Sequence, residues 1–161
     1  MKVLILGGTG FIGERLADYL IEKKYEITIA SRKNYKSPNR KIRNIIKINW
    51  NDAASIEKAC EGIDIVIFAA GVSAKESSEN LINTIEFSKK GTLNLINAAK
   101  KCSIKEIIYL STAHVYCSPL LGKINENSKL ENKHPYAISH SISEEIIIKA
   151  QKNCNNLKTK V

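Results

Sequence analysis

Apolar stretches alternate with amphipathic stretches along most of the chain. Apolar residues that return about every fourth position indicate helices with one buried stripe, such as Ile12, Leu16 and Leu20, or Leu81, Ile85 and later Leu95, Ala99. Between such stretches lie runs with the continuous apolar character of strands buried on both faces. These runs are Lys2 to Leu6, Glu26 to Ser31, Ile45 to Asn49, Ile63 to Ala69, and Glu106 to Ser111. The alternation predicts βαβ units and a parallel sheet.

Three further segments complete the predicted pattern. Ser55, just before Ile56, is expected to cap a short helix that ends at Gly62. The stretch from Cys117 to His134 is rich in Pro, Gly and Asn, and it is interpreted as a surface loop long enough to be functional. The segment Asn155 to Val161 resembles the start of another strand, which could cover the edge of the fifth strand.

A glycine-rich turn joins the first strand to the first helix, with the sequence Gly7-Gly8-Thr9-Gly10-Phe11-Ile12-Gly13. In this context Gly7 makes the tight turn, Gly10 admits a pyrophosphate close to the backbone, and Gly13 lets the helix pack on the strand. The helix N-terminus then favours the phosphates. A turn that serves only chain reversal is the less favoured interpretation. We therefore predict a single three-layer α/β Rossmann domain over residues 1–161, with a parallel sheet of five to six strands, helices on both faces, and NAD(P) as cofactor.

The end of the second strand carries Ser31-Arg32-Lys33. An acidic residue at this point usually binds the ribose 2′-hydroxyl of NAD. A hydroxyl beside two cations can instead bind a 2′-phosphate through charge-assisted hydrogen bonds. NADP is therefore favoured, with NAD as the alternative, and Arg32 can also stack on the adenine or belong to a solvated loop.

Composition excludes several classes of protein. A 43% hydrophobic and 25% charged chain is typical of soluble globular proteins, and no apolar run reaches the length of a membrane span. The absence of a signal-peptide pattern favours the cytoplasm. The net charge of +9 is spread over most segments, which argues against a specific nucleic-acid partner. The cysteines form no C-x-x-C pair, and His114 and His134 have no partners at ligand spacing, so no metal site is expected.

Four stretches, in this order and spacing, resemble the extended short-chain dehydrogenase/reductase family, whose best-known members are epimerases, dehydratases and reductases of nucleotide sugars. Besides the glycine turn, they are Asp64-Ile65-Val66-Ile67-Phe68-Ala69-Ala70-Gly71, Leu110-Ser111-Thr112-Ala113-His114-Val115-Tyr116, and Pro135-Tyr136-Ala137-Ile138-Ser139-His140 with Glu144 after it. The resemblance implies that Ala69, Ala70 and Gly71 contact the cofactor and that Asn49 and Trp50 flank the adenine.

The resemblance also implies catalytic roles. Thr112 matches the hydroxyl that holds the substrate oxygen, and Tyr136 matches the acid/base. Moving a hydride at a carbinol carbon requires a proton relay, which a phenol beside a cation can supply. The family has Lys four residues after the Tyr, whereas this chain has His140. A neutral imidazole can donate to the ribose but supplies less positive charge near pH 7. Packing roles for Tyr136 and Thr112 remain the alternative.

Members of the family continue beyond this point with a C-terminal substrate-binding region that these residues lack. We therefore expect either a nucleotide-sugar epimerase, dehydratase or reductase, or a catalytically weak, truncated NADP(H)-binding module. The resemblance further implies a homodimer formed through helices over Leu81 to Lys101 and Tyr136 to Lys152.

Overall fold

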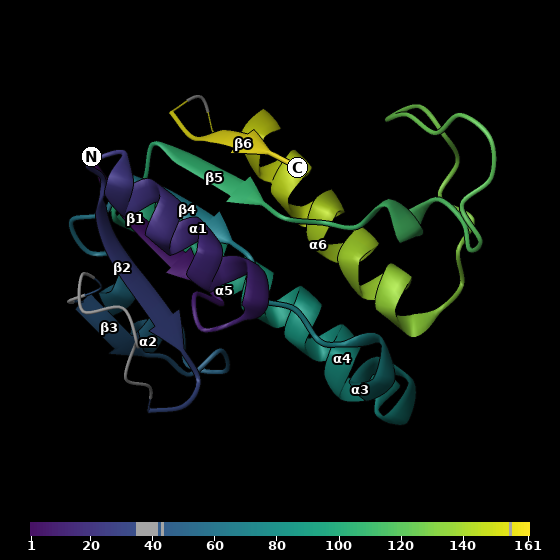
Figure 1. Ribbon diagram of the computed structural model, residues 1–161, viewed down its shortest axis with the longest axis horizontal. Helices are drawn as coiled ribbons and strands as arrows, with labels where there is room; N and C mark the ends of the chain where they lie inside the picture. Colours follow the sequence, from purple (N-terminus) through teal and green to yellow (C-terminus); the bar gives the residue numbers. More distant parts are fainter. Residues whose placement is uncertain (35–41, 43, 155) are drawn as a thin grey trace.

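The computed structural model describes residues 1–34, 42, 44–154 and 156–161, and its centre is a six-stranded parallel sheet (Figure 1). The strands lie in the order β3-β2-β1-β4-β5-β6. Their bounds are β1 (Lys2–Leu6), β2 (Glu26–Ser31), β3 (Asn44–Lys47), β4 (Ile65–Phe68), β5 (Glu106–Tyr109) and β6 (Lys158–Lys160). The order reverses between β1 and β4, and parallel sheets open a crevice at the carboxyl ends of their strands at such a point.

Helices cover both faces of the sheet, as predicted (Figure 1). Helix α1 (Phe11–Glu22) packs on one face, while α2 (Ala53–Cys60), α5 (Thr92–Lys101) and α6 (Pro135–Lys152) pack on the other. Two short helices, α3 (Ala74–Glu79) and α4 (Leu81–Glu86), follow β4, and α4 continues through the π-helical turn η1 (Phe87–Gly91) into α5. A 3₁₀ turn, η2 (Ala113–Val115), follows β5. The predicted three-layer Rossmann fold is confirmed.

Two apolar cores hold the layers together. The larger lies between the sheet and α2, α5 and α6, and it includes Phe68, Leu95 and Ile147. The smaller lies under α1, where Ala17 packs near Ile5 and Ile29. The four cysteines are free thiols. Among the described residues, no helix is long and apolar enough to cross a membrane.

Strand boundaries differ from prediction where turns begin early. β1 and β2 have the predicted bounds. β3 ends at Lys47 rather than Asn49, because the chain turns so that the Asp52 N–H donates to the Asn49 carbonyl. β4 spans only Ile65–Phe68, and β5 ends at Tyr109 rather than Ser111. The predicted sixth strand exists as Lys158–Lys160, paired in parallel with β5; Asn155 lies outside the described residues.

Two predictions about the helices are wrong in detail. Asp52, not Ser55, caps α2, which ends at Cys60; the Ser55 hydroxyl instead accepts a hydrogen bond from the Asn49 N–H at 2.9 Å. The predicted apolar stripes hold for Leu95 and Ala99, which are buried, and in part for Leu16 and Leu20, which pack against the core. They fail at Ile12, which is 60% exposed, and at Leu81, which is 44% exposed, because the small residues Gly13, Ala17, Thr84 and Ser88 face the interior instead.

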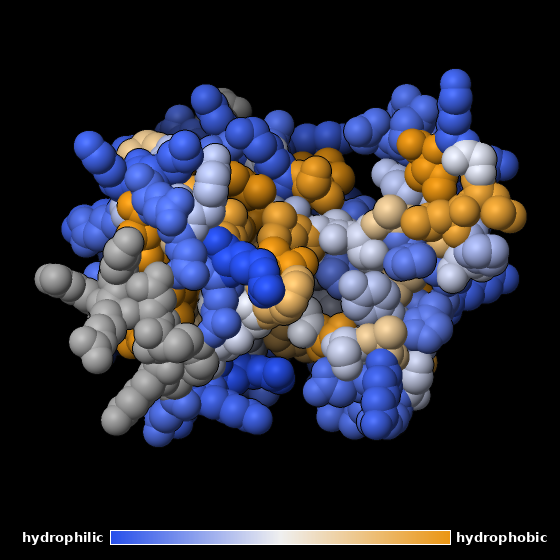
Figure 2. Space-filling view, in the orientation of Figure 1, coloured by the Kyte–Doolittle hydropathy of each residue, from blue (hydrophilic) through white to orange (hydrophobic). Residues whose placement is uncertain are grey.

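The surface loop was predicted correctly. All residues from 117 to 134 are described, and they contain no helix or strand. Its exposed apolar side chains Leu120, Leu121 and Leu130 contribute to the hydrophobic surface at the projecting end of the molecule (Figure 2).

Candidate functional site

A continuous groove runs along the carboxyl ends of the strands, and we call it the strand-end groove. Its central hollow, about 320 Å³, shares Arg32, Ile48, Trp50 and Phe87 with an outer hollow of about 510 Å³ near β3. It also shares Ala69, Gly71 and Val72 with an inner hollow of about 330 Å³ near α6. Most of the predicted site residues line these three hollows: Gly7, Thr9, Gly10, Ile12, Ser31, Arg32, Asn49, Trp50, Ala69, Ala70, Gly71, Tyr136 and His140.

The glycine turn needs its glycines for three different reasons. Gly7 has φ +86°, and a β-carbon there would lie 2.7 Å from the Ala70 nitrogen. A β-carbon on Gly13 would lie 2.3 Å from the Gly7 carbonyl oxygen, so only glycine lets α1 pack this closely on the turn. Gly10 lines the groove, where its missing side chain leaves the backbone open to a ligand.

The first turn of α1 presents backbone N–H groups without a side-chain cap. Gly10 is the N-cap residue, and among the described residues no side chain makes a cap hydrogen bond to the turn that follows it. Uncapped N–H groups and the helix dipole together favour an anion. Phe11 is 74% exposed outside the groove, with the Arg15 guanidinium 3.7 Å from its ring centroid. The turn therefore offers a phosphate site made mainly of backbone groups.

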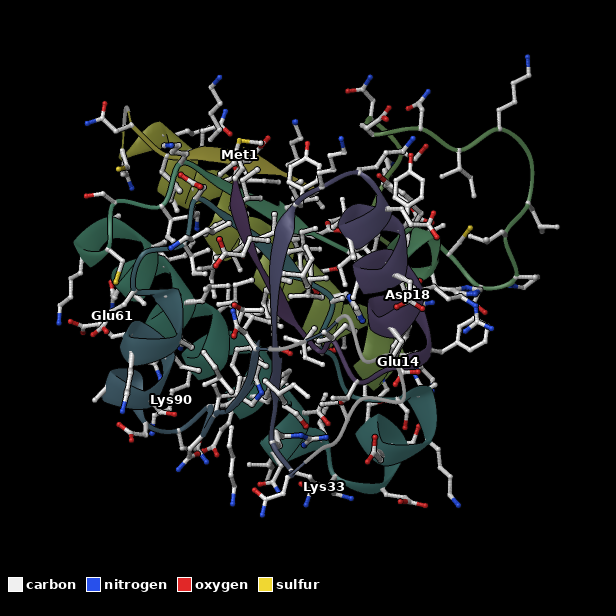
Figure 3. All side chains as sticks on the ribbon, turned by 60° about the vertical axis from the view of Figure 1, so that its left-hand side comes forward. Met1, Glu14, Asp18, Lys33, Glu61 and Lys90 are labelled. Carbon is white, nitrogen blue, oxygen red and sulfur yellow. The ribbon has the colours of Figure 1, made fainter. Side chains whose placement is uncertain are left out.

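The end of β2 forms the cationic wall of the groove. Ser31 is buried, and its hydroxyl accepts hydrogen bonds from the Lys33 N–H at 3.2 Å and from the Thr9 hydroxyl at 3.5 Å. Arg32 and Lys33 are exposed, and Figure 3 shows Lys33 beyond the carboxyl end of β2. The pKa of Glu76 lies below its usual value, chiefly because Ser73 hydrogen-bonds it, with Arg32 and Lys33 adding positive potential. Two exposed cations thus lie ready for an anionic group.

The outer end of the groove has a rigid aromatic wall. Trp50 is only 6% exposed, stacks on Phe68 at 5.4 Å between ring centroids, and meets Phe87 edge-on at 5.1 Å. It is therefore a core residue with one edge in the groove. Asn49 is exposed, and its Oδ1 accepts from the Asn51 N–H. The wall fits a flat, partly apolar group such as a nucleobase.

The inner end of the groove holds Tyr136 and His140 from α6. Pro135 begins this helix, and the His134 side chain caps it by accepting from the Tyr136 N–H at 3.2 Å. The two rings meet edge-on with centroids 4.6 Å apart. Because the residues are four apart, one helical turn brings both to the same face. The predicted pair is thus brought together in one hollow.

His140 is buried, and its surroundings favour the neutral form of the imidazole. It is 7% exposed, and burial lowers the pKa of its imidazole below the ordinary value. Its Nδ1 lies 2.8 Å from the Tyr109 hydroxyl, while its Nε2 would be 3.6 Å from a β-carbon on Gly71. One nitrogen therefore has a protein partner, and the other edge faces the lining of the groove.

Thr112 lies outside the residues that line the inner hollow. Its hydroxyl accepts from the His114 N–H at 3.3 Å and so caps η2. A hydroxyl that accepts one hydrogen bond can still donate its own proton. Its neighbour Ser111 does line the hollow, and its buried Oγ has no hydrogen-bond partner among the described residues.

Sequence reasoning did not assign Ser111, Phe87 or Tyr109 to the site. Ser111 stands beside Thr112 in the matched motif, so the same motif could have indicated it. In the sequence, Phe87 and Tyr109 are indistinguishable from ordinary core residues. Only the fold shows that Phe87 lines the groove and that Tyr109 contacts His140. Within the described parts of the chain, no group of three His, Cys, Asp or Glu could hold a metal ion.

Comparison with known proteins identifies the kind of chain that carries this groove. Residues 3–161 match the model of the NAD dependent epimerase/dehydratase family. The UDP-glucose 4-epimerase of Mycoplasma pneumoniae is 33% identical over 158 residues, covering 91% of this chain and 47% of that protein. A putative UDP-glucose 4-epimerase of Methanocaldococcus jannaschii is 29% identical over 160 residues, covering 90% of this chain and 49% of that protein.

A solved structure gives the same picture. The UDP-glucose 4-epimerase of Bifidobacterium longum, in complex with NAD⁺ and UDP, matches with a TM-score of 0.86 and 27% identity, covering 99% of this chain and 51% of that one. The chain spans about half the length of the curated relatives it matches.

Proposed function

Because the chain belongs to the NAD-dependent epimerase/dehydratase family, we propose that the strand-end groove binds NADP(H) and that the protein is an epimerase, dehydratase or reductase of a nucleotide-linked sugar. One observation carries this proposal: the groove is continuous from the glycine turn to Tyr136 and His140. A dinucleotide lying along it would bring its nicotinamide to the only helix-borne phenol–imidazole pair found among the described groove residues.

The residues present fit the cofactor in an extended pose. The turn from Gly7 to Gly13 would hold the pyrophosphate on backbone N–H groups, because its glycines leave no side chain in the way. Asn49 and the edge of Trp50 would contact the adenine at the outer end. Ala69, Ala70 and Gly71 would lie along the inner half, where small residues permit close approach.

A preference for NADP over NAD is the finer part of the proposal. Its support is the end of β2, where Ser31, Arg32 and Lys33 replace the acidic residue expected in NAD-specific sites. A 2′-phosphate would gain charge-assisted hydrogen bonds from the exposed cations. The Bifidobacterium longum relative holds NAD⁺, so NAD is the competing cofactor that any test must include.

The chemistry assigned to the inner hollow is proton transfer during hydride transfer. A nicotinamide cofactor bound there would supply or accept the hydride. Tyr136 would give or take the proton of the sugar hydroxyl, and the free proton of Thr112 would hold the same oxygen. His140 would donate to the nicotinamide ribose. A nucleotide sugar is proposed as the substrate because the matched relatives carry names of such enzymes.

Two alternatives receive less support. A catalytically weak NADP(H)-binding module would explain why His140 stands where the family has lysine. It would not explain why Tyr136 and His140 line the same hollow as Ser111. Specific nucleic-acid binding rests on net charge alone.

A homodimer through α4, α5 and α6 is also proposed. Its support is the exposure of large apolar side chains on α4 and α5, at Leu81, Ile82 and Leu93. Sedimentation tests it: the wild type should sediment as a dimer and Ile82→Asp as a monomer, and a monomeric wild type would refute it.

Calorimetric titration with NADPH and NADH in parallel, at fixed salt and pH, tests the cofactor proposal. We expect NADPH to bind more tightly. Ser31→Asp should reverse the order, since a carboxylate repels the 2′-phosphate and binds the 2′-hydroxyl. Lys149→Ala is the matched control, because Lys149 is exposed on α6 and pairs with Glu145 away from the groove. Binding of neither cofactor would contradict the function, and tighter NADH binding by the wild type would contradict only the preference.

A further inference from the structure

Tyr109 is a buried phenol that the proposed chemistry leaves unused. It lies on β5, is 4% exposed, and its ring stacks on that of His140 with 5.8 Å between centroids. Its hydroxyl is 2.8 Å from Nδ1 of His140. Because β5 and α6 both belong to the packed layers, this contact joins the core to the inner hollow.

The direction of this hydrogen bond decides what His140 presents to the groove. A neutral imidazole has one N–H, so if Nδ1 accepts, Nε2 must carry the proton. Burial raises the pKa of Tyr109 above its ordinary value, so its phenol stays protonated and must donate somewhere. The Ser143 hydroxyl, its other polar neighbour, accepts from Thr92 at 3.1 Å and donates to the Ser88 carbonyl at 3.4 Å. Nδ1 of His140 lies 2.8 Å from the phenol oxygen and is the acceptor placed to take the phenol proton.

We propose that Tyr109 is a positioning residue: its hydroxyl donates to Nδ1 and fixes His140 as the Nε2–H tautomer, which points a hydrogen-bond donor into the inner hollow. Nε2 faces Gly71, where even a β-carbon would be at ordinary contact distance, 3.6 Å, so the space beside Nε2 is open. The proposal rests on the proposed function only for the identity of the acceptor, a cofactor ribose hydroxyl. The tautomer itself requires no bound ligand.

Burial favours the neutral form of both groups, and the charges near Tyr109 favour its neutral form further. Desolvation acts on His140, while Glu144 of the same helix and Tyr136 add to the rise in the pKa of Tyr109. No described cation is within ion-pair distance of Glu144. A hydrogen bond between two neutral groups, rather than an ion pair, therefore holds the ring.

Nitrogen NMR of the histidine side chains in ¹⁵N-labelled protein without cofactor tests the tautomer. The chain has 3 histidines, and a His140→Gln variant assigns the signal. We expect a protonated Nε2 and an unprotonated Nδ1 in the wild type. In Tyr109→Phe, which removes only the hydroxyl, the signal should become a mixture of tautomers. Tyr25→Phe, a partly buried tyrosine in the other core, is the matched control and should change nothing.

Cofactor titration of the same proteins supplies the second measurement. Tyr109→Phe should weaken NADPH binding by about three- to tenfold, the effect of losing one oriented hydrogen bond, while its amide spectrum shows an intact fold. A wild-type Nδ1–H tautomer, or an unchanged His140 signal in Tyr109→Phe, would overturn the inference. A wild type with the expected tautomer but no affinity for either dinucleotide would instead refute the proposed function alone.

Discussion

The ring of Tyr136 meets that of His140 edge-on, with 4.6 Å between the centroids, on the face of α6 that borders the inner hollow. Where the resembled family has lysine, this chain has an imidazole whose pKa burial lowers. The phenol therefore lies beside a neutral imidazole rather than beside a fixed positive charge. This difference governs what substitutions at the two positions should do.

Tyr136→Phe should lower turnover of a UDP-hexose by about 10²- to 10⁴-fold, the usual contribution of a positioned acid/base. His140→Lys should preserve or raise turnover, because an ammonium group beside the phenol lowers its pKa. Tyr25→Phe serves as the control for loss of a phenol elsewhere. Turnover is measured with NADP⁺ and with NAD⁺. Equal activity in wild type, Tyr136→Phe and His140→Lys would end the catalytic assignment.

The fold could be predicted from the sequence because its strongest signals are local. β1 and β2 are apolar runs that end in a glycine turn and at Ser31, and both have the predicted bounds. Helix stripes were less predictable, since Gly13 and Thr84 face the interior while Ile12 and Leu81 are exposed. Close packing selects small residues there, and hydrophobicity alone does not reveal this.

The site residues could be predicted only where they belong to a recognisable sequence motif. The glycine turn and the pair on α6 belong to motifs, and the fold brings them into one groove. The partner of His140 is Tyr109, which is 31 residues away in sequence and indistinguishable from a core tyrosine. Likewise, Trp50 lines the groove, but its packing against Phe68 and Phe87 could not be predicted from the sequence. Long-range contacts of this kind depend on the register of packed elements.

Gly13→Ala and Gly10→Ala should separate folding from cofactor binding. A β-carbon at Gly13 would lie 2.3 Å from the Gly7 carbonyl oxygen, so that variant should lose about 1–3 kcal/mol of unfolding free energy, as overpacked sites do. At Gly10 a β-carbon would lie 3.3 Å from the Gly7 carbonyl oxygen, a tight contact that a small shift relieves, and φ is −88°, so alanine should cost the fold much less than at Gly13. Its methyl group should nevertheless weaken NADPH binding, because it occupies the groove.

Urea unfolding and calorimetric titration of both glycine variants provide the readout. Normal NADPH affinity in a stable Gly10→Ala protein would show that the turn does not contact the phosphates. Wild-type stability in Gly13→Ala would contradict the packing argument.

Stability should fall as the pH drops below about 6.5, the ordinary pKa of histidine, because of His140. Burial lowers the pKa of His140 in the folded protein. At pH values between the pKa of the folded protein and that of the unfolded chain, the unfolded chain therefore binds more protons. The contribution of His140 to the free energy of unfolding is therefore complete above the pKa of the unfolded chain. It is lost as the pH falls toward the pKa of the folded protein, with a slope of at most about 1.4 kcal/mol per pH unit. The carboxyls with lowered pKa, Asp64, Glu76 and Glu145, act in the same direction but at more acidic pH.

Urea unfolding between about pH 7.5 and pH 5.5 isolates this histidine contribution, since the carboxyl groups stay ionised there. His140→Gln should flatten the dependence, because glutamine keeps a polar side chain without a titrating proton. His114→Gln, at an exposed position on η2, is the control and should keep the wild-type slope. If His140→Gln retains the full slope while His114→Gln loses it, the buried imidazole is not the group that titrates.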